Sequence, residues 1–154
     1  MTQTVAFIGL GNMGGGMAAN LVKAGFVVNA FDLSSAAQEH ARESGCHVVD
    51  SAKAAVDGAD FIVSMLPNGT IVESVYIDGD ALLDVIDKSA LVLDCSTVAP
   101  ATSRRVDAEA AKRGIRAIAA PVSGGVAAAA AGTFAFLWGG PEDDYQGRLF
   151  ITAG

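Results

Sequence analysis

The chain has 154 residues, of which 51% are hydrophobic, and this length suffices for one domain with a buried core. Its net charge of -7 makes a nucleic-acid partner unfavourable, and no apolar run reaches the roughly 18 residues that a membrane-spanning helix needs. The N-terminus has no basic stretch before an apolar one, and Cys46 and Cys95 lie far apart, so we expect a cytoplasmic protein without a signal peptide or disulfide.

In the first part of the chain, short apolar runs alternate with amphipathic segments. Glycines at positions 25 and 45 are typical of the ends of helices, and Ser34 is a good N-cap. In chain order we expect a strand at 4–9, a helix at 12–24, a strand at 26–32, a helix from 34 to about 44, a strand at 46–49 and a helix at 51–56.

The same alternation continues through the rest of the chain. We expect a strand at 60–66, a helix at 70–76, a strand at 90–94, a helix at 100–113, a strand at 115–120, a loop at 121–125, a small-residue helical turn at 126–131 and a strand at 133–138. Alternating strands and helices form parallel units with right-handed crossovers. The sequence therefore predicts an α/β, Rossmann-like, doubly wound, mostly parallel sheet with helices on both faces.

A glycine-rich pattern, G-x-G-x-x-G, follows the first expected strand and opens the first expected helix. The first glycine allows a tight turn, the second leaves room for a pyrophosphate to approach the backbone, and the third allows close packing of helix and strand. The unpaired N–H groups at the start of the helix point toward such an anion. We expect a cofactor-binding role for Gly9, Leu10, Gly11, Asn12, Met13 and Gly14; the alternative is an ordinary tight turn.

Asp32 ends the second expected strand, at the spacing where an acidic residue binds the adenosine ribose. Its carboxylate would repel the 2′-phosphate of NADP, and no arginine follows in the next few positions. The sequence therefore favours NAD over NADP. The alternative role for Asp32 is to cap the helix that begins near Ser34, and the two roles are compatible.

Several segments carry a resemblance to a known family. Residues 7–14 and 17–21 resemble the signature of the β-hydroxyacid dehydrogenases, and within that family the chain is most similar to the 3-hydroxyisobutyrate dehydrogenase group. Residues 64–67 resemble the family's strand end beneath the nicotinamide side of the cofactor. Residues 94–100 resemble its D-x-S-T-x-x-P loop, and residues 120–126 resemble its substrate loop.

The resemblance implies further site residues. Leu66, Pro67 and Thr97 would contact the cofactor, and Ser123, Gly124 and Gly125 would bind the substrate carboxylate. The residue types suit these roles, since a threonine hydroxyl can bind a ribose or nicotinamide and a Ser-Gly-Gly segment exposes backbone N–H groups. Taken singly, each segment is also compatible with plain turn chemistry. His40 and His47 have no partner at ligand spacing, so we expect no metal.

The family's catalytic lysine stands in a G-x-G-x-x-x-K-x-x-N-N segment that begins a second, all-helical domain. None of the chain's lysines lies in such a segment: Lys23, Lys53, Lys88 and Lys112. We therefore expect residues 1–154 to form only the NAD-binding domain, with no catalytic residue present and the lysine beyond Gly154. The resemblance also implies that the full-length protein is a homo-oligomer.

The resemblance implies that the full-length protein oxidises a small 3-hydroxyacid, such as 3-hydroxyisobutyrate, to its semialdehyde with NAD. Two alternatives remain open. One is a semialdehyde reductase of the same family that acts on a C3 acid. The other is a non-catalytic nucleotide-binding module.

Overall fold

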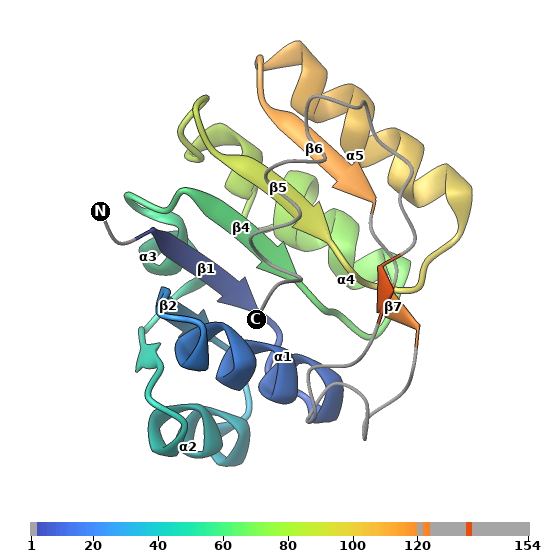
Figure 1. Cartoon of the computed structure of the whole chain (residues 1–154). Coiled ribbons are helices and arrows are strands. Elements are labelled where there is room, and N and C mark those ends of the chain that lie inside the picture. Colours follow the sequence, from blue (N-terminus) through green and yellow to red (C-terminus); the bar gives the residue numbers. More distant parts are fainter. Residues whose placement is uncertain (1–2, 120–121, 124–134, 137–154) are drawn as a thin grey trace.

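A parallel six-stranded sheet forms the centre of the computed structural model, which describes residues 3–119, 122–123 and 135–136. The strand order is β3-β2-β1-β4-β5-β6 (Figure 1), which confirms the predicted doubly wound α/β class. The strands are β1 (Thr4–Ile8), β2 (Val27–Phe31), β3 (His47–Val48), β4 (Phe61–Ser64), β5 (Leu91–Asp94) and β6 (Arg116–Ala119).

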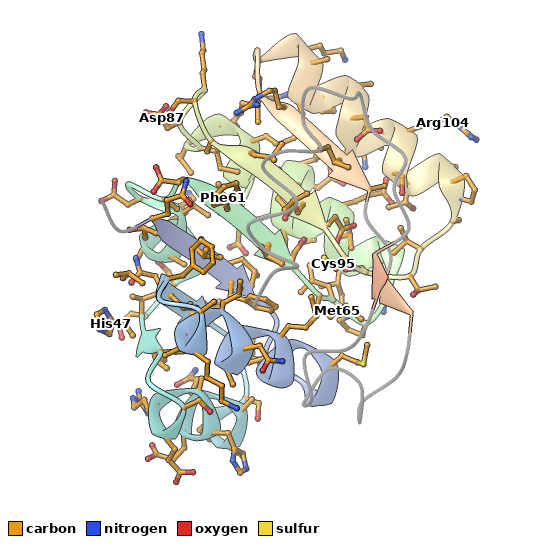
Figure 2. The ribbon with its side chains drawn as sticks, in the orientation of Figure 1. His47, Phe61, Met65, Asp87, Cys95 and Arg104 are labelled. Atoms are coloured by element: carbon orange, nitrogen blue, oxygen red, sulfur yellow. The ribbon has the colours of Figure 1, made fainter. Side chains whose placement is uncertain are left out.

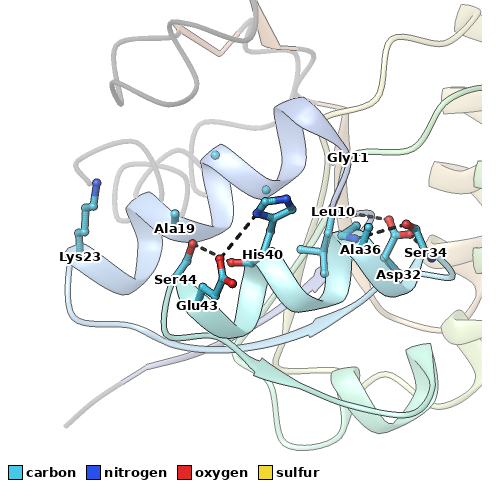
Figure 3. Close-up of a pocket in the computed structure, with 13 residues that line it drawn as sticks. Leu10, Gly11, Ala19, Lys23, Asp32, Ser34, Ala36, His40, Glu43 and Ser44 are labelled. Carbon is cyan, nitrogen blue, oxygen red and sulfur yellow. Dashed lines mark hydrogen bonds and ion pairs between the residues drawn. The ribbon is translucent and has the colours of Figure 1, made fainter.

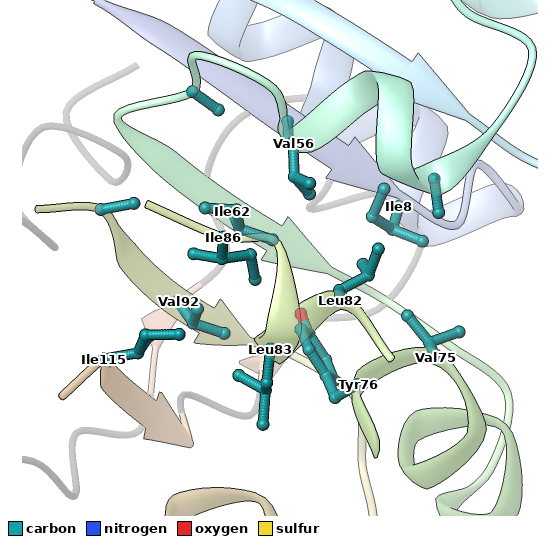
Figure 4. Close-up of a cluster of buried hydrophobic side chains, with 14 of the residues drawn as sticks. Ile8, Val56, Ile62, Val75, Tyr76, Leu82, Leu83, Ile86, Val92 and Ile115 are labelled. Carbon is teal, nitrogen blue, oxygen red and sulfur yellow. The ribbon is translucent and has the colours of Figure 1, made fainter. Parts of the chain in front are cut away.

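Helices cover both faces of this sheet. One face packs against α1 (Asn12–Lys23) and α2 (Ser35–Glu43). The other packs against α3 (Ala52–Val56), α4 (Gly69–Glu73), a π-helical turn η1 (Ser74–Asp78), a 3₁₀ turn η2 (Leu82–Asp84) and α5 (Pro100–Lys112). Figure 4 shows the apolar cluster on this second face. Because both faces are covered, every residue of β4 and β5 is buried, which explains why both strands are apolar up to their last residues, Ser64 and Asp94.

Side-chain caps fix where several helices begin. The hydroxyl of Ser34 accepts a hydrogen bond from the Ala37 N–H at 3.3 Å, which confirms the predicted N-cap of α2. Asn68 caps α4 in the same way, through the Ile71 N–H at 3.0 Å. Pro100 stands in the first turn of α5, where its missing N–H costs nothing. Among the described residues, no helix is both long and apolar enough to cross a membrane.

The structure corrects two sequence predictions. The helix expected at 70–76 is α4 followed by the π turn, in which the Gly79 N–H donates to the Ser74 carbonyl at 2.7 Å. The loop expected at 121–125 contains a short strand, β7 (Val122–Ser123). It pairs antiparallel with β8 (Ala135–Phe136), the described part of the strand expected at 133–138, so these two strands form a separate sheet. The helical turn expected at 126–131 lies outside the described residues.

Candidate functional site

The glycine-rich turn lies at the carboxyl end of β1, and the structure shows why two of its glycines are required. Gly9 has φ of +97°, and a Cβ on it would overlap the Met65 carbonyl oxygen. Its N–H donates to the Phe31 carbonyl at 3.0 Å. A Cβ on Gly14 would overlap the carbonyl oxygen of Gly9. The first turn of α1 therefore packs directly on the end of β1, as the pattern predicts.

Gly11, between these two, faces open space. A Cβ built there meets no atom of the described chain within 4 Å. Gly11 is also the N-cap of α1, which has neither a capping side-chain hydrogen bond nor an acidic residue in its first turn. The start of α1 thus combines free space with N–H groups that no side chain caps, an arrangement that suits a phosphate group. Asn12 opens this helix, and Met13 is half-buried against the apolar core.

Asp32 follows β2 and ties the glycine-rich turn to this strand. One carboxylate oxygen accepts a hydrogen bond from the Leu10 N–H at 2.7 Å, and the other accepts one from the Ser34 N–H at 2.7 Å. Its side chain is thereby fixed beside the turn. The cap of α2 is Ser34, so Asp32 supports the start of that helix but is not its N-cap. The sequence predicted the position of Asp32 but not its bond to Leu10.

Two hollows meet at Asp32. A groove of about 750 Å³ begins at Leu10, Gly11 and Asp32 and runs between α1 and α2 as far as Lys23 (Figure 3). A smaller pocket of about 230 Å³ lies on the other side of Asp32 and is mostly apolar. Its lining includes Leu33, Leu66, Pro67, Ile71 and Val75. Leu33 is 92% exposed, so its apolar surface is available to a flat, apolar ligand group at the pocket.

Leu66 and Pro67 both lie beside Asp32 in this pocket. The resemblance associates their segment with the nicotinamide side of a cofactor. In the structure both residues share a pocket with Asp32, the residue expected at the adenosine ribose.

The next two strands, β4 and β5, end in a buried polar network that sequence reasoning missed. The Ser64 hydroxyl donates to Asp94 Oδ1 at 2.9 Å and accepts a hydrogen bond from the Tyr76 hydroxyl at 2.6 Å. The Ser96 hydroxyl donates to the same Oδ1 at 2.7 Å and accepts one from the Leu66 N–H at 2.8 Å. The D-x-S-T pattern was visible in the sequence, but nothing there indicated that Tyr76 reaches it.

Burial shapes the electrostatics of this network. It raises the pKa of the Asp94 carboxyl, although hydrogen bonds from Ser96 and Ser64 act in the opposite direction. Burial, and secondarily the nearby Asp94 charge, raises the pKa of Tyr76 and of Cys95 well above their usual ranges. Tyr76 and Cys95 are therefore neutral near pH 7. Figure 2 shows Cys95 and Met65 at the carboxyl ends of neighbouring strands, whereas Phe61 and Asp87 lie toward their beginnings.

The remaining expected site residues lie toward β5 and β7. Thr97 is exposed in the loop after β5, directly after Ser96. Ser123 lies in β7, opposite Ala135 of β8, and Gly124 and Gly125 lie outside the described residues. Lys23 lines the far part of the groove, and no lysine lines the apolar pocket. Within the described ranges, no group of three or more His, Cys, Asp or Glu side chains is placed to hold a metal ion.

A parallel sheet of order 3-2-1-4-5-6, a glycine-rich turn at the end of its first strand and an acidic residue after its second define a dinucleotide-binding domain. Residues 4–149 match the family model described as the NAD-binding domain of 6-phosphogluconate dehydrogenase. The chain belongs to this family and is an NAD-binding domain.

Two curated relatives come from Pseudomonas aeruginosa: a 3-hydroxyisobutyrate dehydrogenase and an NAD-dependent L-serine dehydrogenase. Each is 50% identical to this chain over 141 residues, which is 92% of this chain and 47% of the relative. A solved structure of the Mycobacterium tuberculosis 3-hydroxyisobutyrate dehydrogenase with L-serine superposes on this chain with a TM-score of 0.93 and 41% sequence identity. The matched region covers 99% of this chain and 51% of the solved chain. The chain thus spans about half the length of these relatives.

Proposed function

We propose that this chain is the cofactor-binding half of a dehydrogenase that oxidises a small 3-hydroxyacid, such as 3-hydroxyisobutyrate, to its semialdehyde with NAD. The observation that carries the proposal is the placement of Asp32. Its carboxylate lies at the junction of the groove and the apolar pocket and is held beside the glycine-rich turn through Leu10. The identity to 3-hydroxyacid dehydrogenases over nearly the whole chain supports the choice of substrate class.

The residues of the turn fit a bound dinucleotide. The open space at Gly11 admits the pyrophosphate, which the first N–H groups of α1 would bind. Asp32 would accept hydrogen bonds from the ribose hydroxyls through lone pairs that Leu10 and Ser34 leave free, and the adenine would lie against Leu33, Leu66 and Pro67. When bound, the nicotinamide supplies the hydride acceptor.

Toward the other end of the dinucleotide, the proposed contacts come from the loop after β5 and from the segment around β7. The Thr97 hydroxyl would bind the ribose or the nicotinamide, which orients the ring. Ser123, Gly124 and Gly125 would bind the substrate carboxylate and hold the alcohol carbon near the hydride acceptor. We propose that the proton of the substrate hydroxyl is removed by a lysine of the family's G-x-G-x-x-x-K-x-x-N-N segment, a pattern that does not occur among these 154 residues.

L-Serine is a second candidate substrate. One of the relatives that are 50% identical is named for L-serine oxidation, and the solved structure with a TM-score of 0.93 contains L-serine. Serine and 3-hydroxyisobutyrate share a carboxylate and a C3 hydroxyl, and they differ in the group on C2. An amino group in place of a methyl group requires a polar partner, so the two substrates are separated by comparing kcat/KM for each.

The cofactor assignment is tested by calorimetric titration of the chain with NAD and NADP. We expect the wild type to bind NAD at least about tenfold more tightly, since the fixed Asp32 carboxylate repels a 2′-phosphate. Asp32→Asn removes this charge but keeps an oxygen that can accept the Leu10 N–H, so it should lose the preference for NAD while the turn stays in place. Equal affinity for both cofactors in the wild type would contradict the assignment.

The activity is tested by following NADH formation with 3-hydroxyisobutyrate, L-serine and 3-hydroxypropionate. We expect the 154-residue chain to bind NAD and to be nearly inactive, since a general base contributes about 10²–10⁴-fold. A longer product of the same gene that carries the lysine segment should be active. Normal dehydrogenase turnover by the 154 residues alone would contradict the assignment of the base, and inactivity of the longer product would favour a non-catalytic module.

A further inference from the structure

In the buried network at the ends of β4 and β5, both serine hydroxyls donate hydrogen bonds to one carboxylate, that of Asp94. Ser64 and Asp94 are register partners on neighbouring parallel strands, so their side chains lie on the same face of the sheet. Asp94 Oδ1 accepts hydrogen bonds from the Ser64 hydroxyl, the Ser96 hydroxyl and the Ser96 N–H, the last at 3.2 Å. Each serine hydroxyl therefore uses its single O–H group to donate a hydrogen bond to Asp94.

This arrangement connects Asp94 to the loop after β4. The Leu66 N–H donates to the Ser96 hydroxyl at 2.8 Å, and the next residue, Pro67, has no N–H of its own. The position of Leu66 therefore depends on Ser96, which Asp94 holds at both its hydroxyl and its N–H. The loop after β5 contains the same serine, directly before Thr97. Both loops are tied to a single carboxylate.

Burying a carboxylate between two strands costs free energy, because the charged group loses its contact with water. Asp94 is 7% exposed, and Ser64 and Tyr76 are fully buried around it. Well-packed apolar residues at such positions commonly give equal or greater stability. Stability alone therefore does not explain the network, whereas a need for fixed loop geometry does, because each hydrogen bond specifies a direction as well as a distance.

We infer that Asp94 is a positioning residue for the cofactor site, which holds the Leu66–Pro67 loop through Ser96 and orients the Thr97 loop that follows it. The inference rests on the proposed cofactor contacts of Leu66, Pro67 and Thr97. Asp94 itself lies beneath these residues and need not touch the cofactor.

The test compares Asp94→Ala with Asp94→Asn and with a matched control, Val106→Ala. Val106 is 4% exposed on α5, belongs to the apolar cluster on the same face and lines a small cavity together with Asp94. Its truncation therefore destabilises the fold by loosening the packing beside Asp94, but it removes none of the hydrogen bonds of the network. Two quantities are measured under conditions in which every variant is folded. They are the Kd for NAD by calorimetry and, without NAD, the hydrogen-exchange rate of the Leu66 amide by NMR.

We expect Asp94→Ala to raise the Kd for NAD about tenfold and to accelerate exchange of the Leu66 amide by a similar factor. Asp94→Asn retains an oxygen that accepts from both serines, so its Kd should stay within about threefold of the wild type. Val106→Ala should lower Tm while leaving the Kd within about twofold and the Leu66 exchange unchanged.

The inference is overturned if Asp94→Ala leaves the exchange of the Leu66 amide unchanged, or if Val106→Ala weakens NAD binding as much as Asp94→Ala does. If instead the proposed function is wrong, these measurements give a different result. In that case the wild type does not bind NAD, while the Leu66 amide still reports whether Asp94 holds the loop.

Discussion

The two halves of the candidate site are made in different ways. At the ends of β1 and β2 the site consists of backbone and empty space, with Gly9, Gly11 and Gly14 around the turn and one carboxylate that accepts two backbone N–H groups. At the ends of β4 and β5, buried side-chain hydroxyls converge on Asp94. The first half should therefore be most sensitive to atoms added at its glycines and then to loss of its one carboxylate, and the second half to removal of its hydrogen-bonding groups.

The largest expected effect is that of an added methyl group at Gly14. Gly14→Ala places a Cβ against the carbonyl oxygen of Gly9, so the helix must move away from the strand. We expect the free energy of unfolding to fall by about 3 kcal/mol, measured by urea denaturation. Gly11→Ala is the control, because its Cβ meets open space and should cost about 1 kcal/mol or less. Equal losses for the two variants would contradict the description of the turn.

Removal of the Asp32 carboxylate should have the next largest effect. Asp32→Ala leaves the Leu10 and Ser34 N–H groups without their acceptor. We expect a loss of about 1–2 kcal/mol of unfolding free energy, together with weaker NAD binding. Asp32→Asn retains one acceptor oxygen and should lie between Asp32→Ala and the wild type. If the two substitutions destabilise equally, charge rather than hydrogen bonding anchors the turn.

Tyr76→Phe tests the second half by removing one buried hydroxyl. The variant loses the hydrogen bond to Ser64, while Ser64 keeps its bond to Asp94. We expect a loss of about 1 kcal/mol in unfolding free energy. The Kd for NAD should stay close to that of the wild type, because the branch through Ser96 to Leu66 is untouched. A change in Kd as large as that of Asp94→Ala would show that the two branches act as one unit.

The smallest effect is expected from an ion pair outside both halves. Arg105 on α5 contacts Asp78 at 2.9 Å and Glu73 at 2.7 Å on the exposed surface. Hydrogen bonding to Arg105 lowers the pKa of Asp78, so this stabilisation is present above the carboxyl's unfolded-state pKa and is lost as the pH falls through its lower folded-state pKa. Arg105→Met should lower Tm slightly at neutral pH and low salt. The difference from the wild type should vanish in acid and in high salt, with no change in NAD affinity.

The sequence predicted the first half of the site better than the second for a physical reason. A backbone conformation with positive φ, or a strand packed against a helix, restricts the residue type at one position, so Gly9 and Gly14 are visible in a local pattern. The network around Asp94 joins residues from different elements, since Ser64 is 30 positions away in the sequence. Ser64 meets Asp94 only through the pairing of β4 with β5, and Tyr76 reaches Ser64 from η1, and neither contact is contained in a local pattern.

Two further differences have similar origins. The sequence of residues 74–78 is Ser-Val-Tyr-Ile-Asp, which an ordinary α-helix also accommodates. Nothing in the sequence therefore indicated a π turn. The two-residue strand β7 lies between a proline and a glycine, residues that indicate a loop, and it becomes a strand only through pairing with β8.

The π turn at Ser74–Asp78 also affects which changes in chain length the domain can accept. A π turn contains one residue more than an α-helical turn of the same rise. Deleting one residue there would convert the turn into a regular α-helical turn, in which the side chains between Ser74 and Asp78 no longer have the directions that the π turn gives them. Tyr76, which is fully buried and bonded to Ser64, would then lose its orientation. We therefore expect related genes to vary in length in the surface loops but to keep the number of codons between β4 and β5 constant across this turn.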